Sequence, residues 1–166
     1  LFYSDANPGA EAIALELGRE IDNCQPTKLE KSEVIPGKGP QKSSFLLLLN
    51  TKTFVGDAGE LLAQQTRQLL RTCRCHILLV HGVDPEDDGC RFEVFFETTP
   101  TDLMRDWKLF SVVAEPWFHD LDYRTGSVAR ISRHLATNAK QKPKAMRQRG
   151  EREDSKILQD LKGEWA

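Results

Sequence analysis

Two short runs of consecutive apolar residues, Phe45 to Leu49 and Ile77 to Val80, constrain the fold of this chain most. A strand that is covered on both faces has such a continuous apolar run, and this is typical of the central strands of a parallel sheet. Neither run is long enough to cross a bilayer, and no signal peptide is visible. We therefore predict an α/β domain that is soluble and cytoplasmic, without a membrane segment.

Strand and helix patterns alternate along the chain. The predicted strands are Leu1 to Ser4, a weak one near Glu33 to Ile35, Phe45 to Leu49, Ile77 to Val80 and Leu109 to Val113. The predicted helices run from the N-cap Asn7 to about Asp22, from Asp57 to Cys73, from about Thr99 for a short stretch, and from Thr125 to Thr137. This alternation predicts right-handed crossovers and a flavodoxin-like five-stranded parallel sheet with helices on both faces. Ligands of such sheets bind beyond the carboxyl ends of the strands, here the loops Ser4 to Pro8, Asn50 to Gly56 and His81 to Gly89.

The charge pattern separates a folded domain from a tail. Residues 1–138 have globular composition, whereas residues 139–166 read as a basic linker followed by a short amphipathic helix near Ser155 to Leu161. The formal net charge of −2 makes nucleic acid an unexpected partner. The chain starts inside an apparent strand and without Met, so we expect it to be part of a longer protein.

The cysteine and histidine residues do not form a recognisable site. Cys73, Cys75 and His76 are too close together for a zinc site, and no second pair of ligands accompanies them. Cys90 follows His81 by only nine positions, too few for the strand–helix–strand connection of a Cys–His protease. We therefore expect reduced thiols, no metal, and a His81 side chain that packs a loop.

The order of these elements resembles the TIR (Toll/interleukin-1 receptor) domain family over residues 1–138. The matching pieces are Leu1 to Ser4 with the helix after it, Phe45 to Asn50, the helix Asp57 to Cys73, and Ile77 to Val80. The stretches Asp84 to Cys90 and Phe95 to Pro100 are similar to a divergent TIR-like subgroup in large multidomain proteins of algae and other protists.

This resemblance implies an interaction or scaffold module of a signalling protein. TIR domains associate through the loop after the second strand, here Pro36 to Ser44, and through neighbouring helices. Some also cleave NAD at the nicotinamide–ribose bond with a glutamate on the helix before the fourth strand, and that position holds Thr66. A hydroxyl supplies no negative charge to stabilise the cationic ribose of the transition state, so we expect no NAD-cleaving activity and no cofactor.

Two alternatives stay open. The first is an NAD+ glycohydrolase or nucleotide-binding sensor with a non-standard catalytic residue, in which NAD is substrate or ligand. Its binding residues would be Ser4, Asp5, Asn7, Asn50 and Thr66. The second is a flavodoxin-like sensor of a small ligand without catalysis.

Overall fold

A five-stranded, all-parallel sheet with the strand order β2-β1-β3-β4-β5 forms the centre of the molecule. The computed structural model describes residues 1–29, 43–72 and 75–140. Its strands are β1 Phe2–Tyr3, β2 Thr27–Lys28, β3 Ser43–Leu49, β4 Cys75–Gly82 and β5 Glu115–Trp117. Its helices are α1 Ala10–Glu20, α2 Gly56–Thr72, α3 Val94–Thr98, α4 Thr101–Arg105 and α5 Leu121–Lys140, with 3-10 turns η1 Pro85–Asp87 and η2 Leu109–Ser111. The predicted flavodoxin-like fold is confirmed.

The two predicted apolar runs are the central strands β3 and β4. They pair over seven residues, from Ser43 opposite Cys75 to Leu49 opposite His81. Successive side chains of a strand point to opposite faces. Phe45, Leu47 and Leu49 therefore enter one core, whereas Leu46 and Leu48 enter the other.

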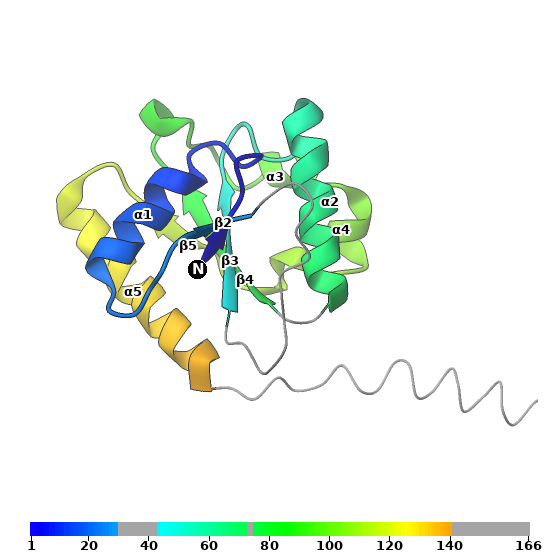
Figure 1. The fold of residues 1–166 in the computed structure, drawn as a ribbon. Coiled ribbons are helices and arrows are strands. Elements are labelled where there is room, and N and C mark those ends of the chain that lie inside the picture. The colour runs from blue at the N-terminus through cyan, green and yellow to red at the C-terminus, as the bar shows by residue number, and fades with distance from the viewer. Residues whose placement is uncertain (30–42, 73–74, 141–166) are drawn as a thin grey trace, which may run out of the picture.

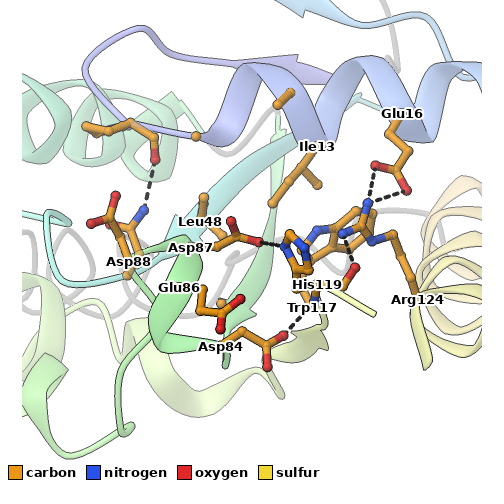
Figure 2. Close-up of a pocket in the computed structure, with 15 residues that line it drawn as sticks. Ile13, Glu16, Leu48, Asp84, Glu86, Asp87, Asp88, Trp117, His119 and Arg124 are labelled. Atoms are coloured by element: carbon orange, nitrogen blue, oxygen red, sulfur yellow. Dashed lines mark hydrogen bonds and ion pairs between the residues drawn. The ribbon is translucent and has the colours of Figure 1, made fainter. Parts of the chain in front are cut away.

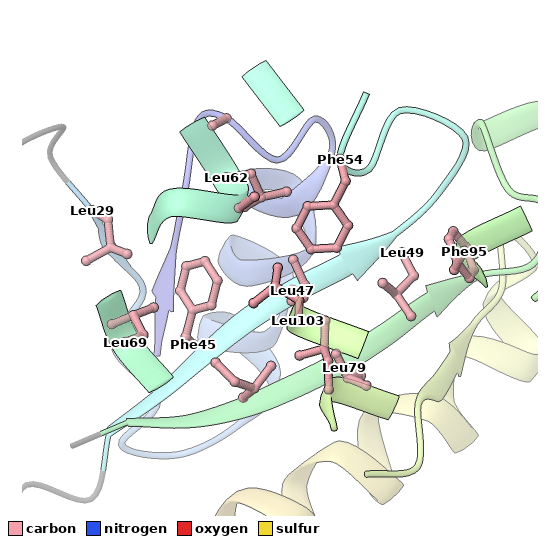
Figure 3. Close-up of a cluster of buried hydrophobic side chains, with 14 residues drawn as sticks. Leu29, Phe45, Leu47, Leu49, Phe54, Leu62, Leu69, Leu79, Phe95 and Leu103 are labelled. Carbon is pink, nitrogen blue, oxygen red and sulfur yellow. The ribbon is translucent and has the colours of Figure 1, made fainter. Parts of the chain in front are cut away.

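Helices cover both faces of the sheet and complete these two cores. One layer holds α1 and α5, and the other holds α2, α3 and α4 (Figure 1). In α1, the apolar residues recur at helical spacing, so Ala10, Ile13, Ala14 and Leu17 are buried against the sheet. Figure 3 shows the other core, in which Leu62 and Leu69 of α2 lie over Phe45, and Leu103 of α4 lies beside Leu79.

The last strand begins six residues later than predicted. The apolar stretch from Leu109 to Val113 begins as the turn η2, and β5 is Glu115–Trp117. Leu109 is buried in the core of the α2 layer, but Val112 and Val113 are 38% and 76% exposed. The apolar run closes the end of a core instead of joining the sheet, and for this reason the prediction was wrong.

The start of the chain also differs from prediction. A second strand forms at Thr27–Lys28, where the chain returns beside β1 and the N–H of Leu29 donates to the carbonyl of Tyr3 at 2.8 Å. Asn7 is not an N-cap, because α1 begins at Ala10 after Gly9 and the Asn7 side chain bonds to β3. The predicted strand Glu33 to Ile35, most of the loop Pro36 to Ser44, and the predicted tail from residue 141 onward, with Ser155 to Leu161, lie outside the described residues. Ser43 and Ser44 begin β3, and residues 139 and 140, predicted as the start of the tail, end α5.

Candidate functional site

A cavity of about 480 Å³ opens at the carboxyl ends of β3, β4 and β5, on the face that α1 and α5 cover (Figure 2). Its wall comes from all three of the loops in which a ligand site was predicted. The lining residues are Pro8, Gly9, Ala12, Ile13, Glu16, Leu48, Asn50, Gly82, Asp84, Glu86, Asp87, Asp88, Trp117, His119 and Arg124. We take this cavity as the candidate functional site.

Two buried asparagines hold the β1 and β3 ends of the cavity together. The Asn7 side chain accepts a hydrogen bond from the N–H of Leu48 at 2.7 Å and donates to the carbonyl of Leu48 at 2.9 Å. The Asn50 side chain donates to the carbonyl of Pro8 at 2.9 Å and accepts from the N–H of Lys52 at 3.0 Å. The Asn7 amide replaces a main-chain partner beyond the end of the β1–β3 ladder, and the Asn50 amide ties the loop after β3 to the turn before α1.

The tight loop from Asp84 to Gly89, which contains η1, forms one wall of the cavity. The N–H of Gly89 donates to the carbonyl of Asp84 at 2.9 Å, which closes the loop at its base. A Cβ at residue 89 would lie 2.5 Å from that carbonyl oxygen, so only glycine allows this approach. Asp88 has a left-handed backbone with φ of 61°, and its side chain pairs with Lys52 at 2.5 Å.

His119 joins this loop to the segment after β5. Its main-chain N–H donates to the Asp84 carboxylate at 2.5 Å, and its Nδ1 lies 2.7 Å from the Asp87 carboxylate. The hydrogen bond and charge of Asp87 raise the pKa of His119 above its usual value, with a smaller contribution from Glu86. The protonated form of His119 is therefore favoured beside these acids.

Arg124 is fixed at the α5 side of the cavity. Its guanidinium lies over the Trp117 ring at 5.5 Å and pairs with Glu16 of α1 at 3.2 Å. It also donates to the carbonyls of Phe118 at 2.8 Å and His119 at 2.6 Å. Because its donors are held by these partners, Arg124 acts mainly as a brace between α1, β5 and α5.

Acidic groups dominate the electrostatics of the cavity. Five carboxylates line it, from Glu16, Asp84, Glu86, Asp87 and Asp88, whereas Arg124 is the permanent cation among the lining residues. A negative wall of this kind disfavours phosphate groups and favours cations. Among the described residues, no group of three or more His, Cys, Asp and Glu side chains could hold a metal ion.

Of the residues predicted to bind NAD, Ser4, Asp5, Asn7 and Thr66 do not line the cavity. Asn50 lines the cavity, and Asn7 lies behind it, bonded to β3. Ser4 is buried and donates to the Gln65 side chain of α2 at 2.6 Å, and Asp5 is exposed and pairs with Lys28. Thr66 is also on α2, fully buried, and its hydroxyl donates to the carbonyl of Leu62 at 2.8 Å.

The prediction from sequence missed the β5 side of the cavity: Trp117, His119 and Arg124, with Glu16 opposite them. Trp117 ends the last strand, and His119 and Arg124 follow it. The predicted strand, Leu109 to Val113, ends four residues before Trp117, so the loop at its carboxyl end was misplaced. The pattern Glu115-Pro116-Trp117, with a helix start soon after it, was the available signal.

The thiols of the described residues carry no reactive site. The N–H of the His81 ring contacts the main-chain carbonyl of Cys90 at 2.6 Å, and both Phe92 and Phe95 meet the ring edge-to-face. Burial raises the pKa of the Cys24 and Cys90 thiols, and it raises the pKa of Cys75 to about 12. His81 thus packs a loop as predicted, and these thiols stay protonated at neutral pH.

Comparison with known protein families, with curated proteins and with solved structures found no match. Within the described ranges, no helix has both the length and the apolar character needed to cross a membrane.

Proposed function

We propose that the chain is a TIR-like protein-interaction or scaffold module without NAD-cleaving activity. The environment of Thr66 is the observation that carries this proposal. The order of elements supports the TIR-like part, since the five parallel strands follow the flavodoxin-like order that the resemblance implies.

The position of Thr66 offers no group for glycosidic cleavage. Cleavage of the nicotinamide–ribose bond needs a carboxylate near the ribose as positive charge develops. Thr66 has no exposed surface, and its hydroxyl is bonded within its own helix. Its neighbour Gln65 is engaged by Ser4, and Glu60, the nearest acid on the same helix, is exposed and lies about one and two-thirds turns away.

The cavity also argues against the alternative of an NAD+ glycohydrolase or nucleotide-binding sensor. It lies where dinucleotides bind in doubly wound sheets. Its wall nevertheless holds five carboxylates, and a diphosphate placed there would meet like charges at short range. Arg124, the cation that could offset this repulsion, is already paired with Glu16.

Exposed apolar side chains supply a surface for partners. Phe96 of α3 is 52% exposed and meets the rings of Phe92 and Phe110 edge-to-face, and Val113, three residues after Phe110 in the chain, is 76% exposed. Contiguous exposed apolar side chains are typical of interaction sites. We call Phe96, Phe110, Val112 and Val113 the α3–η2 patch.

The main chain of β5, at the edge of the sheet, is poorly suited to pair with a strand of a partner. Pro116 has no N–H to donate, and its carbonyl already accepts a hydrogen bond from the Ser127 hydroxyl at 2.6 Å. A proline and a capped carbonyl prevent another strand from adding to this edge. We therefore expect partners to contact the side chains of the α3–η2 patch and not to extend the sheet at β5.

Sedimentation velocity over a range of protein concentrations, combined with a nicotinamide-release assay, tests the proposal. We expect reversible self-association that Val113→Lys weakens, and no release of nicotinamide from NAD. Gln64→Lys, at an exposed position of α2, is the matched control and should associate like the wild type.

Two results would contradict the proposal. Clear nicotinamide release by the wild type would show that the reasoning from Thr66 is wrong. A monomer at every concentration, together with failure of the wild-type chain to capture a partner that Val113→Lys no longer binds, would contradict the interaction role.

A further inference from the structure

The proposed function leaves the cavity at the carboxyl edge of β3, β4 and β5 without a role. Its volume of about 480 Å³ lies within the range of small-molecule sites. It lies on the α1 and α5 side of the sheet, away from the α3–η2 patch. A ligand bound in this cavity would therefore not compete with a protein partner bound at the α3–η2 patch.

The base of the cavity is apolar and preformed. Ile13 of α1, Leu48 of β3 and Trp117 of β5 line it, and each keeps less than a tenth of its surface exposed. Trp117 is fixed under Arg124, so its ring is held in position. A flat or aliphatic body would bury apolar surface against these three side chains.

Of the five carboxylates that line the cavity, four already have a partner in the described part of the chain and one does not. Asp87 contacts His119, Asp88 pairs with Lys52, and Glu16 pairs with Arg124. The Asp84 carboxylate accepts the main-chain N–H of His119. Glu86 makes no hydrogen bond or ion pair with the described residues, and Figure 2 shows its carboxylate among the lining groups without a partner.

We propose that this cavity binds a small organic cation: a primary amine or amidinium carried on an apolar body. The body lies on Ile13, Leu48 and Trp117, and the cationic head faces Glu86 and the carboxylates beside it. An anion of the same shape meets the same carboxylates and is rejected. The apolar floor of the cavity thus fits a cation and an anion of the same shape, and the carboxylates select the cation by charge.

The test uses two probes of matched shape and opposite charge, 2-phenylethylamine and 3-phenylpropionate. Binding is followed by ¹H–¹⁵N NMR, with the indole N–H signal of Trp117 as the local readout. For an amine of this size we expect a dissociation constant of about 1 mM, and little binding of the carboxylate. Shifts should fall on Trp117, Gly82 and the first turn of α1.

Three variants define the site. Glu86→Gln removes the free charge at an exposed position and should weaken amine binding about fivefold or more. Glu60→Gln, an exposed acid of α2 on the other face of the sheet, should leave binding unchanged. Ala12→Phe places a ring into the cavity from an exposed helical position and should abolish binding while the spectrum of the fold is kept.

Several outcomes would overturn the inference. These are equal binding of both probes, amine shifts that bypass Trp117, unchanged affinity of Glu86→Gln, or no response to the amine at about 10 mM, well above the expected constant. Preference for the amine, lost in Glu86→Gln and kept in Glu60→Gln, would support it. None of these outcomes depends on whether the domain self-associates.

Discussion

Replacing Asn7 with alanine should destabilise the domain strongly, although Asn7 contributes no apolar surface to the core. The Asn7 amide is 1% exposed and replaces a strand backbone beside Leu48. β1 pairs with β3 at one register position, Phe2 opposite Phe45, so no main-chain partner from β1 reaches Leu48. The side chain therefore provides both hydrogen bonds that a longer β1 would have made.

The expected magnitude follows from these two bonds. In Asn7→Ala the N–H of Leu48 loses its partner, and an unsatisfied buried donor costs about 1–3 kcal/mol. The carbonyl of Leu48 loses one bond but keeps the Thr53 hydroxyl at 2.7 Å, and this loss adds about 1 kcal/mol. The sum is about 3 kcal/mol, which for a chain of this size lowers Tm by about 10 °C.

Thermal and urea denaturation followed by circular dichroism measure this effect. Gln64→Ala, at an exposed position of α2, is the control and should change the free energy of unfolding by less than about 0.5 kcal/mol. Asn7→Asp is a second variant of nearly the same shape that keeps the acceptor for the Leu48 N–H and loses the donor to its carbonyl. A loss in Asn7→Ala no larger than in Gln64→Ala would refute the reasoning.

Three further predictions concern α2 and the ion pairs. Thr66→Glu should lower the free energy of unfolding by about 3 kcal/mol or more and release no nicotinamide, because it buries a carboxylate at a position without exposure; an active, stable variant would contradict this. The pKa of Asp102 is held low by its hydrogen bonds to Arg67, so Asp102→Asn should cost up to about 1 kcal/mol at neutral pH. That difference in denaturation midpoint is present above pH about 4 and shrinks as pH falls through the lowered pKa, and a constant difference would exclude the pair as its source. The pKa of His119 is raised by Asp87, so any stability that His119→Gln removes should be present below pH about 6.5 and vanish as pH rises through the raised pKa; a difference that grows with pH would count against the pair.

The sequence specified the central part of the fold well. The runs at Phe45 and Ile77 predicted two covered strands because a strand apolar on both faces has few other arrangements. The helices α1 and α2 followed from apolar residues at helical spacing. Apolar runs and apolar residues at helical spacing are local sequence patterns, so they can be recognised before the fold is known.

The edges of the sheet were not predictable in the same way. β2 has two exposed residues, and β5 contains a proline, so neither has the apolar pattern of a strand. Their pairing depends on the neighbouring strands, which the local sequence does not encode. Trp117, His119 and Arg124 lie in or after β5, and the prediction from sequence missed them because the strand signal of Glu115-Pro116-Trp117 is weak.

The alternation of β3 and β4 between two cores has a consequence for how this domain can change. The sheet separates Thr66 and the α3–η2 patch from the cavity, since they belong to opposite layers. Substitutions that share no contacts have nearly additive effects on stability. One face can thus accumulate changes while the other keeps its shape, so the proposed ligand site on the α1 side and the proposed association surface on the α2 side are free to diverge independently.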